Sequence, residues 1–157
     1  MNIKLVRGTD EDAKNLYDIQ VKAFESLLKK YEDYDISPAK ETIEYTIGRI
    51  NYPFGVYYKI IFEEKLIGGI RIQWWNNRTC YRISPIFILP EYQNRGIGRE
   101  VINKVEKIYV RALTWELETI LEEEKNCNFY ERLGYRKTGE SKKINSKTTI
   151  VFYKKYM

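Results

Sequence analysis

Apolar residues recur along the chain with two different spacings, and these predict an alternation of strands and helices. Residues 3–6 are predicted to form a short first strand. Thr9, with Asp12 three residues later, is typical of a capping box that starts a helix, and we expect this helix to end near Tyr31. Its apolar face consists of Leu16, Ile19, Ala23 and Leu27.

A second helix is predicted to follow, because Ser37 and Pro38 supply an N-cap and a first-turn proline. Its buried side is predicted to consist of Ile43, Ile47 and Ile50. From residue 57 the spacing becomes that of strands, since β-branched and aromatic residues dominate segments that short polar turns separate. These predicted strands are residues 57–62, 66–75 and 79–89.

The segment from Ile86 to Val101 then combines a strand, a glycine-containing turn and a helix. The backbone N–H groups of residues 94–99 come at the start of this helix, where they have no partner within it and where the helix dipole favours negative charge. Gly96 and Gly98 let the backbone approach a ligand closely. The sequence therefore predicts a site for an anionic group such as a phosphate. The predicted apolar stripe of the helix is Val101, Val105, Ile108 and Ala112.

Two common nucleotide motifs fit this turn poorly. Val101 stands where the dinucleotide motif G-x-G-x-x-G has its third glycine, and no P-loop motif occurs in the chain. After the turn we expect a strand at residues 115–121, a short helix at 126–133 and a closing hairpin around Asn145 and Ser146.

Two motifs carry a resemblance to a known family. The run from Gln93 to Gly98, QNRGIG, resembles the Q/R-x-x-G-x-G/A pyrophosphate loop of the GNAT N-acetyltransferase superfamily. The run from Asn126 to Tyr135, NCNFYERLGY, resembles the N-x-x-F-Y-E-K-L-G-F/Y signature of that superfamily's last helix, with Arg132 in place of the usual lysine. The predicted element order, β-α-α-β-β-β-α-β-α-β-β, is similar to the GNAT order across essentially the whole chain.

The resemblance implies an α/β (α+β) fold with one mixed, twisted sheet of about seven strands flanked by about four helices. It also implies that the sheet opens between the strand ending at Leu89 and the strand at residues 115–121, and that acetyl-coenzyme A (acetyl-CoA) lies in this gap. Pro85 marks either a bulge that opens the gap or an ordinary strand edge.

The coenzyme contacts follow from the same resemblance. The amides of residues 94–99 would hold the pyrophosphate, and the backbone of one strand would pair with the pantetheine arm as though adding a strand. Asn126 either binds this arm or caps the last helix. The predicted coenzyme-binding residues are Ile86, Phe87, Ile88, Gln93, Asn94, Arg95, Gly96, Ile97, Gly98, Arg99 and Asn126.

The chemistry expected of this family is direct transfer of an acetyl group to a primary amine. The chain has no histidine, so no imidazole acts as base or acid. Tyr130 is the candidate general acid, because it matches a tyrosine that many GNAT members turn toward the coenzyme sulfur; alternatively it only packs beneath Phe129. Cys80 and Cys127 are interpreted as packing residues, and an acyl-enzyme route through either lacks an activating imidazole.

The general base is not assigned from the sequence. Glu116 and Glu118 share one face of their predicted strand, where they are either solvated or part of the site. Arg82 interrupts an apolar strand and points either to the acceptor or to solvent. Of Trp74 and Trp75, which face opposite sides of their strand, at most one lines a pocket.

Acceptor recognition in this family comes largely from the first two helices and the loop between them. Here the loop carries Tyr31, Asp33 and Asp35 in an otherwise basic protein. These residues would attract a cationic amine through charge and cation–π contact, or they form an ordinary solvated turn.

Composition narrows the function further. A chain of 157 residues suits a single domain over residues 1–157. The 27 basic and 22 acidic residues give a net charge of +5, but the lysines are dispersed, so nucleic acid is not an expected partner. No membrane span, signal peptide, disulfide framework or metal site is apparent, and we expect a cytoplasmic protein.

The expected activity is that of an acetyl-CoA-dependent N-acetyltransferase acting on a small-molecule or peptide amine. The alternative is a coenzyme A-binding sensor or scaffold of the same fold that lacks catalysis. Dimers are common in this family, so a homodimer stays open as the assembly.

Overall fold

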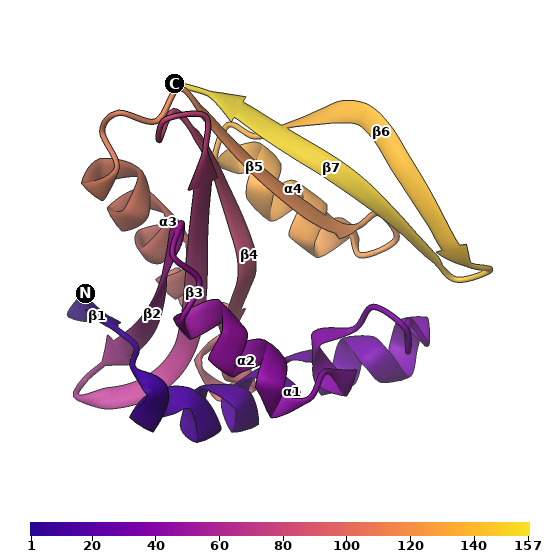
Figure 1. Cartoon of the computed structure of the whole chain (residues 1–157). Helices are drawn as coiled ribbons and strands as arrows, with labels where there is room; N and C mark the ends of the chain where they lie inside the picture. Colours follow the sequence, from indigo (N-terminus) through magenta and orange to yellow (C-terminus); the bar gives the residue numbers. More distant parts are fainter.

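Seven strands form one sheet in the order β1-β2-β3-β4-β5-β7-β6 (Figure 1). The structure is a computed structural model and describes residues 1–157. Its helices and strands follow the predicted order. The elements are β1 (Ile3–Arg7), the short 3₁₀ helix η1 (Asp10–Asp12), α1 (Ala13–Tyr31), η2 (Pro38–Lys40), α2 (Ile43–Ile50), β2 (Gly55–Phe62), β3 (Lys65–Trp75), β4 (Cys80–Ile88), η3 (Pro90–Tyr92), α3 (Ile97–Ile108), β5 (Thr114–Ile120), α4 (Glu124–Arg132), β6 (Arg136–Asn145) and β7 (Thr148–Tyr156).

The sheet opens between β4 and β5. All neighbouring strands pair antiparallel except these two, which run parallel and pair over only three positions, from Cys80 with Thr114 to Arg82 with Glu116. Beyond Arg82 the two strands diverge, and Figure 1 shows the resulting V with its point near the C-terminus of the chain. The predicted mixed sheet and its opening are therefore confirmed.

Helices cover the sheet on both faces. The largest core cluster contains the buried faces of α3 and α4, packed against the strands around Ile70, Trp115 and Leu117. A smaller cluster on the opposite face joins Leu16 and Ala23 of α1 to strand residues of β2 and β4. Figure 1 shows α1 and α2 together on that side, away from α3. None of the helices combines the length and the apolar character that a membrane span requires.

A bulge in β4 marks the start of the opening. Ile72 pairs with Ile83 but Ile70 pairs with Ile86, so Arg71 alone stands opposite both Ser84 and Pro85. The extra residue shifts the alternation of side chains along β4 by one position. Tyr81 and Ile83 face the main core before the bulge, and Ile86 and Ile88 face it after the bulge. Of the two interpretations of Pro85, the bulge is confirmed.

The end of α1 is tied to the β6–β7 hairpin across the mouth of the V. Tyr31 packs with Ile120 and Ile150 in a third core cluster. Its carbonyl oxygen accepts hydrogen bonds from Thr148 Oγ1 at 2.7 Å and from Asn145 Nδ2 at 3.1 Å. We call these contacts the α1–hairpin bridge.

The region around α2 differs from the prediction. Ser37 does cap a turn, since its Oγ accepts from the Ala39 amide at 3.1 Å, but the turn is η2 and the α-helix begins only at Ile43. Thr46 is the fully buried residue of α2, while Ile47 is 39% exposed. The predicted apolar face was therefore wrong at Ile47, because α2 packs beside α1 through a different side.

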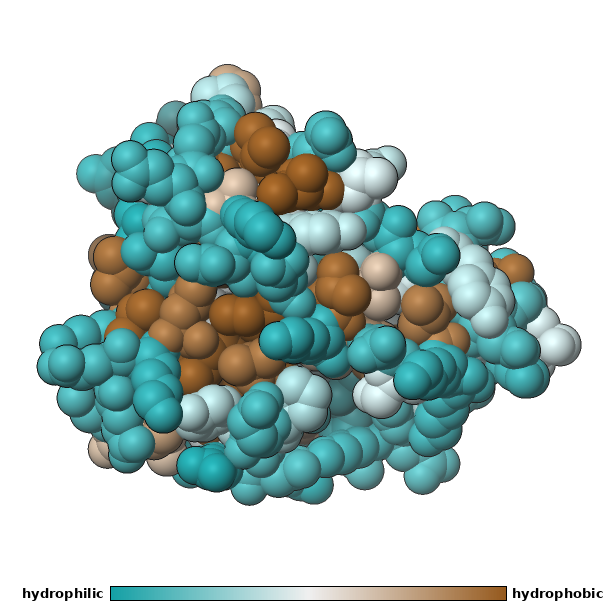
Figure 2. All heavy atoms as spheres, turned by 90° about the horizontal axis from the view of Figure 1, so that it is seen from below, coloured by the Kyte–Doolittle hydropathy of each residue, from teal (hydrophilic) through white to brown (hydrophobic).

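The predicted stripe of α3 also extends too far. Val101 and Val105 are buried as predicted, but the helix ends at Ile108, whose side chain is exposed. Ala112 is buried in the loop that follows rather than on the helix. Figure 2 shows the molecule from below, where hydrophobic side chains lie exposed in a band between hydrophilic margins.

Candidate active site

A cleft of about 1240 Å³ lies where β4 and β5 diverge. One part of its wall comes from the loop before α3 and from α4, and we call this part the coenzyme half. The other comes from α1, the loop after it and Arg49 near the end of α2, and we call it the acceptor half. Both halves meet at the bulge of β4, since Ser84 and Pro85 also line the cleft.

The loop before α3 presents six free backbone amides. The first amide of this helix that donates a hydrogen bond is that of Glu100, to Gly96 O at 3.2 Å; those of residues 94–99 donate none. Asn94 and Gly96 have positive φ angles of 64° and 81°, and these conformations turn the chain into the helix. Six donors at a helix start form a site that suits an anionic group.

The edge of β4 beside this loop is also unpaired. Beyond Arg82 no residue of β4 pairs with β5, although Ile86, Phe87 and Ile88 pair with β3 on the other side. Gln93 folds back onto the end of the strand, where its Nε2 donates to Ile88 O at 2.9 Å. The coenzyme half thus offers an unpaired strand edge that leads to the free amides.

Close packing beneath the loop explains Gly98. A Cβ atom on this residue would lie 3.2 Å from Cζ of Phe129, which is tighter than ordinary van der Waals contact. The first turn of α3 therefore lies directly on α4. This contact joins the two motifs that the sequence analysis singled out, although they are far apart in the chain.

Tyr130 lines the cleft with a hydroxyl that has no partner in the protein. Its ring packs against those of Phe129, Tyr135 and Tyr153 at centroid distances of 5.1, 6.2 and 6.3 Å. Burial raises the pKa of Tyr130 to about 12, with a further contribution from Cys127. The phenol therefore holds its proton throughout the neutral range and can donate it into the cleft.

Asn126 lies inside α4 rather than at its cap. The N-cap residue is Glu123, so the interpretation of Asn126 as the cap was wrong. The Asn126 side chain lines the cleft and makes no hydrogen bond within the protein. It is thus available to a ligand.

The predicted acceptor residues do not all meet. Asp33 lines the cleft and is only 5% exposed, and burial raises the pKa of its carboxyl. Tyr31 is 4% exposed and belongs to the α1–hairpin bridge, so it forms no aromatic wall of the cleft. Asp35 is exposed and lies outside the cleft lining. Neither Trp74 nor Trp75 lines the cleft.

The Arg82 side chain was predicted to point either to the acceptor or to solvent, but it forms an ion pair instead. Its Nη2 donates to Oε1 of Glu118 at 3.1 Å, across the point where β4 and β5 part. Glu116, on the same face, lies 3.9 Å from Lys154 Nζ. Both glutamates on β5 are thus ion-paired. Cys127 is buried and donates to the carbonyl of Ile120, which agrees with a packing role.

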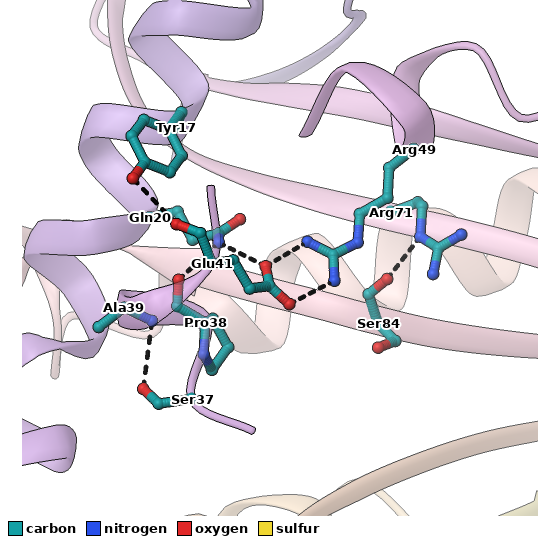
Figure 3. Close-up of polar contacts among 9 residues, drawn as sticks. All are labelled: Tyr17, Gln20, Ser37, Pro38, Ala39, Glu41, Arg49, Arg71 and Ser84. Carbon is teal, nitrogen blue, oxygen red and sulfur yellow. Dashed lines mark hydrogen bonds and ion pairs between the residues drawn. The ribbon is translucent and has the colours of Figure 1, made fainter. Parts of the chain in front are cut away.

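A polar network in the acceptor half escaped the sequence analysis (Figure 3). Glu41 accepts from both Nη atoms of Arg49 at 2.6 and 2.7 Å and from Nε2 of Gln20 at 2.9 Å. Gln20 also donates to Pro38 O at 2.8 Å. The sequence does contain one indication of this network, because Gln20 is a polar residue on the apolar face of its helix, between Leu16 and Ala23.

Comparison with known proteins decides the family. A sequence profile of the acetyltransferase (GNAT) family matches residues 13–135. The chain belongs to the GNAT family. The two GNAT motifs of its sequence lie in the turn with the free amides and in α4, which line the same cleft.

One curated protein shares part of the sequence. The uncharacterized protein YrkN of Bacillus subtilis (strain 168) is 30% identical over 80 residues. The match covers 51% of this chain and 43% of that protein, so less than half of the relative's length is represented.

Solved GNAT structures share the fold at lower identity. An acetyltransferase from Thermus thermophilus has a TM-score of 0.78 at 14% identity, covering 100% of this chain and 98% of that one. The spermidine N-acetyltransferase of Vibrio cholerae in complex with CoA and spermine has a TM-score of 0.76 at 17% identity, covering 98% and 95%. An aminoglycoside 6'-acetyltransferase type Ii has a TM-score of 0.69 at 22% identity, covering 99% and 97%. These likenesses show the fold.

Proposed function

We propose that this chain is an acetyl-CoA-dependent N-acetyltransferase that moves the acetyl group directly to a primary amine. The observation that carries this proposal is the row of six free amides at the end of an unpaired strand edge, in the same cleft as the free hydroxyl of Tyr130. Membership of the GNAT family supports acetyl transfer in general. What the proposal adds to family membership is that the acceptor group is a primary amine.

The coenzyme half fits a long anionic ligand. Free amides and the helix dipole stabilise pyrophosphate charge at residues 94–99. The unpaired edge at Ile86, Phe87 and Ile88 can hydrogen-bond amide groups of an extended arm. Asn126 adds a side-chain amide. The bound coenzyme supplies an acetyl group activated as a thioester.

The acceptor must reach the thioester as a free amine. An amine with a pKa near 10.4 is about one part in a thousand or fewer unprotonated at neutral pH, which costs roughly 4–5 kcal/mol. Asp33 provides a carboxylate on the cleft wall to which the ammonium form can be drawn. No histidine is present, so the proton leaves through a carboxylate or water.

Tyr130 serves as the general acid in this proposal. Its phenol holds a proton at Oη, and no other residue accepts a hydrogen bond from that proton. Donation of this proton to the departing thiolate completes the transfer. The raised pKa favours the donor form at every physiological pH.

Titration of acetyl-CoA into the protein, followed by calorimetry, tests the coenzyme half. We expect micromolar binding that Gly96→Ala weakens at least tenfold, since a side chain strains the positive φ on which the amide array depends. Gly139→Ala is the matched control: Gly139 has a φ of 96° on the exposed strand β6 and nothing within 4 Å of an added Cβ.

Three outcomes separate the possibilities. Loss of binding in Gly96→Ala alone, together with turnover on an amine, supports the proposal. Binding by the wild type without turnover on any amine would favour a coenzyme A sensor or scaffold. Absence of binding by the wild type would overturn the proposal altogether.

A further inference from the structure

Three arginines lie near one another beside the acceptor half, but only two of them have a carboxylate. Arg49 is paired with Glu41 and Arg82 with Glu118. Burial lowers the pKa of Arg71 to about 10, and the nearby positive charges of Arg49 and Arg82 contribute to this shift. No carboxylate lies within ion-pair distance of Arg71, so its charge is the unbalanced one of the three.

The outer nitrogens of Arg71 are free and accessible. Its Nε donates to Ser84 O at 2.6 Å, and neither Nη atom makes a hydrogen bond within the protein (Figure 3). The guanidinium lies over the ring of Tyr52 at 5.9 Å. It lines an open hollow of about 410 Å³ together with Glu44, Tyr45, Gly48, Arg49 and Tyr52. Glu44 forms no ion pair with either arginine.

This hollow adjoins the cleft at Arg49, which lines both. Arg71 is also fixed at the bulge of β4, because its Nε donates to the carbonyl oxygen of Ser84. Ser84 in turn lines the cleft. A group bound at the Nη atoms of Arg71 would therefore lie beside the bulge, where the unpaired β4 edge begins.

A planar guanidinium with two free Nη atoms matches a carboxylate, which can accept two parallel hydrogen bonds. We infer that Arg71 binds a carboxylate of the acceptor, so that the acceptor is an amine that also carries a carboxylate, such as an amino acid or a short peptide. This inference rests on the proposed function for its amine, but the carboxylate site can be measured without turnover.

The charges of the acceptor half favour this class over polyamines. Glu41, Glu118 and Glu123 are already ion-paired, so Asp33 is the one carboxylate of the cleft lining without a cationic partner. A polyamine would bring several positive charges toward three arginines. A carboxylate beside Arg71 instead balances the unpaired charge, and Asp33 remains for a single ammonium group.

The experiment compares acids with their carboxamides. Glycine, leucine, glutamate and diglycine, each beside its carboxamide, are titrated into the CoA-bound protein and followed by NMR chemical shifts. The same compounds are assayed as acetyl acceptors. We expect the acids to bind and to show KM values about tenfold or more below those of the carboxamides.

Arg71→Gln should abolish this preference, and Arg71→Lys should retain part of it because the charge remains. Arg111→Gln is the control, since it removes the same charge from an exposed residue in the loop after α3. The Kd for acetyl-CoA should stay at the wild-type value in all three variants, which shows that the fold and the β4 bulge persist. The two Arg71 variants should melt only a few degrees lower, because they lose the hydrogen bond to Ser84 O.

Equal binding of acids and carboxamides by the wild type would overturn the inference. So would an unchanged preference in Arg71→Gln. If Arg71-dependent binding of acids appears without any turnover, the carboxylate site stands and the proposed N-acetyltransferase activity fails. If carboxamides and polyamines are acetylated as well as the acids, the activity stands and the carboxylate site fails.

Discussion

The two halves of the cleft present different kinds of groups to a ligand. The coenzyme half offers main-chain groups, namely the amides of residues 94–99 and the edge of β4 from Ile86 to Ile88. The acceptor half offers side chains, and most of these are already engaged with one another, as in the pair of Glu41 and Arg49.

This difference has a physical consequence. A main-chain array depends on backbone conformation, which a few glycines and a strand edge determine, so many sequences can build it. A side-chain array depends on which charges find partners after the chain has folded. The coenzyme half therefore suits a ligand shared by a whole family, and the acceptor half can change without disturbing it.

The largest expected effect lies in the coenzyme half, at Tyr130 on α4. We expect Tyr130→Phe to lower kcat about 100-fold or more, because the general acid is removed. Stability should hardly change, since the hydroxyl has no partner to lose. Steady-state kinetics and thermal melting measure the two quantities.

Tyr135→Phe is the matched control for Tyr130. Tyr135 packs against the ring of Tyr130, but its hydroxyl donates to Glu106 at 2.9 Å. Its removal should cost about 1 kcal/mol of stability and leave kcat within a factor of two or three. Wild-type turnover in Tyr130→Phe would show that the phenol only packs.

The next largest effect concerns the stability of the acceptor half. Glu41→Ala leaves Arg49 without its carboxylate in a pair whose side chains are each 17% exposed. We expect a loss of about 2–3 kcal/mol in the free energy of unfolding, below the range for fully buried pairs because water still reaches this one. Chemical denaturation measures this loss.

Glu118→Ala provides the comparison, because its pair with Arg82 is more exposed, at 39% and 27%. Its removal should cost about 0–1 kcal/mol. Both variants should keep the wild-type Kd for acetyl-CoA. Weaker acetyl-CoA binding in Glu41→Ala would show that the two halves are not independent.

The smallest expected effect is a pH dependence from Asp33. Burial raises the pKa of this carboxyl, so the folded state binds its proton more tightly than the unfolded chain does. The contribution of Asp33 to stability is thus most favourable at low pH and is lost as the pH rises through the raised pKa. Asp33→Asn should melt above the wild type at pH 7, by a margin that shrinks toward pH 4.5.

Asp35→Asn, on the exposed part of the same loop, should show no such pH-dependent margin. If both variants behave alike between pH 4.5 and pH 7, the burial of Asp33 has no effect on its protonation. Melting curves at half-unit pH steps are sufficient for this comparison.

The sequence revealed the coenzyme half more fully than the acceptor half. Glycine spacing, a strand ending and a helix start are local features, so the free amides at the start of α3 could be predicted from them. The opening beside β4 came only from the resemblance to the GNAT family. The position of Gly98 on Phe129 was not predicted, because no local pattern links the two motifs.

The acceptor half depends on contacts between distant segments. Tyr31 looked like part of a loop, but it is buried because residues more than a hundred positions away, in the β6–β7 hairpin, bind its carbonyl. No local pattern singles out Arg71 within the predicted strand at residues 66–75. Only the register across the bulge shows that it stands alone opposite Ser84 and Pro85.

The α1–hairpin bridge has a mechanical consequence for the cleft. The V is joined at its point by the three paired positions of β4 and β5, and at its mouth by Tyr31, Thr148 and the ion pair of Glu32 with Lys147 at 2.6 Å. Contacts at both the point and the mouth oppose widening of the cleft, so its width is fixed before a ligand binds. Binding energy is then not consumed in closing the site, and all of it can serve to distinguish one ligand from another.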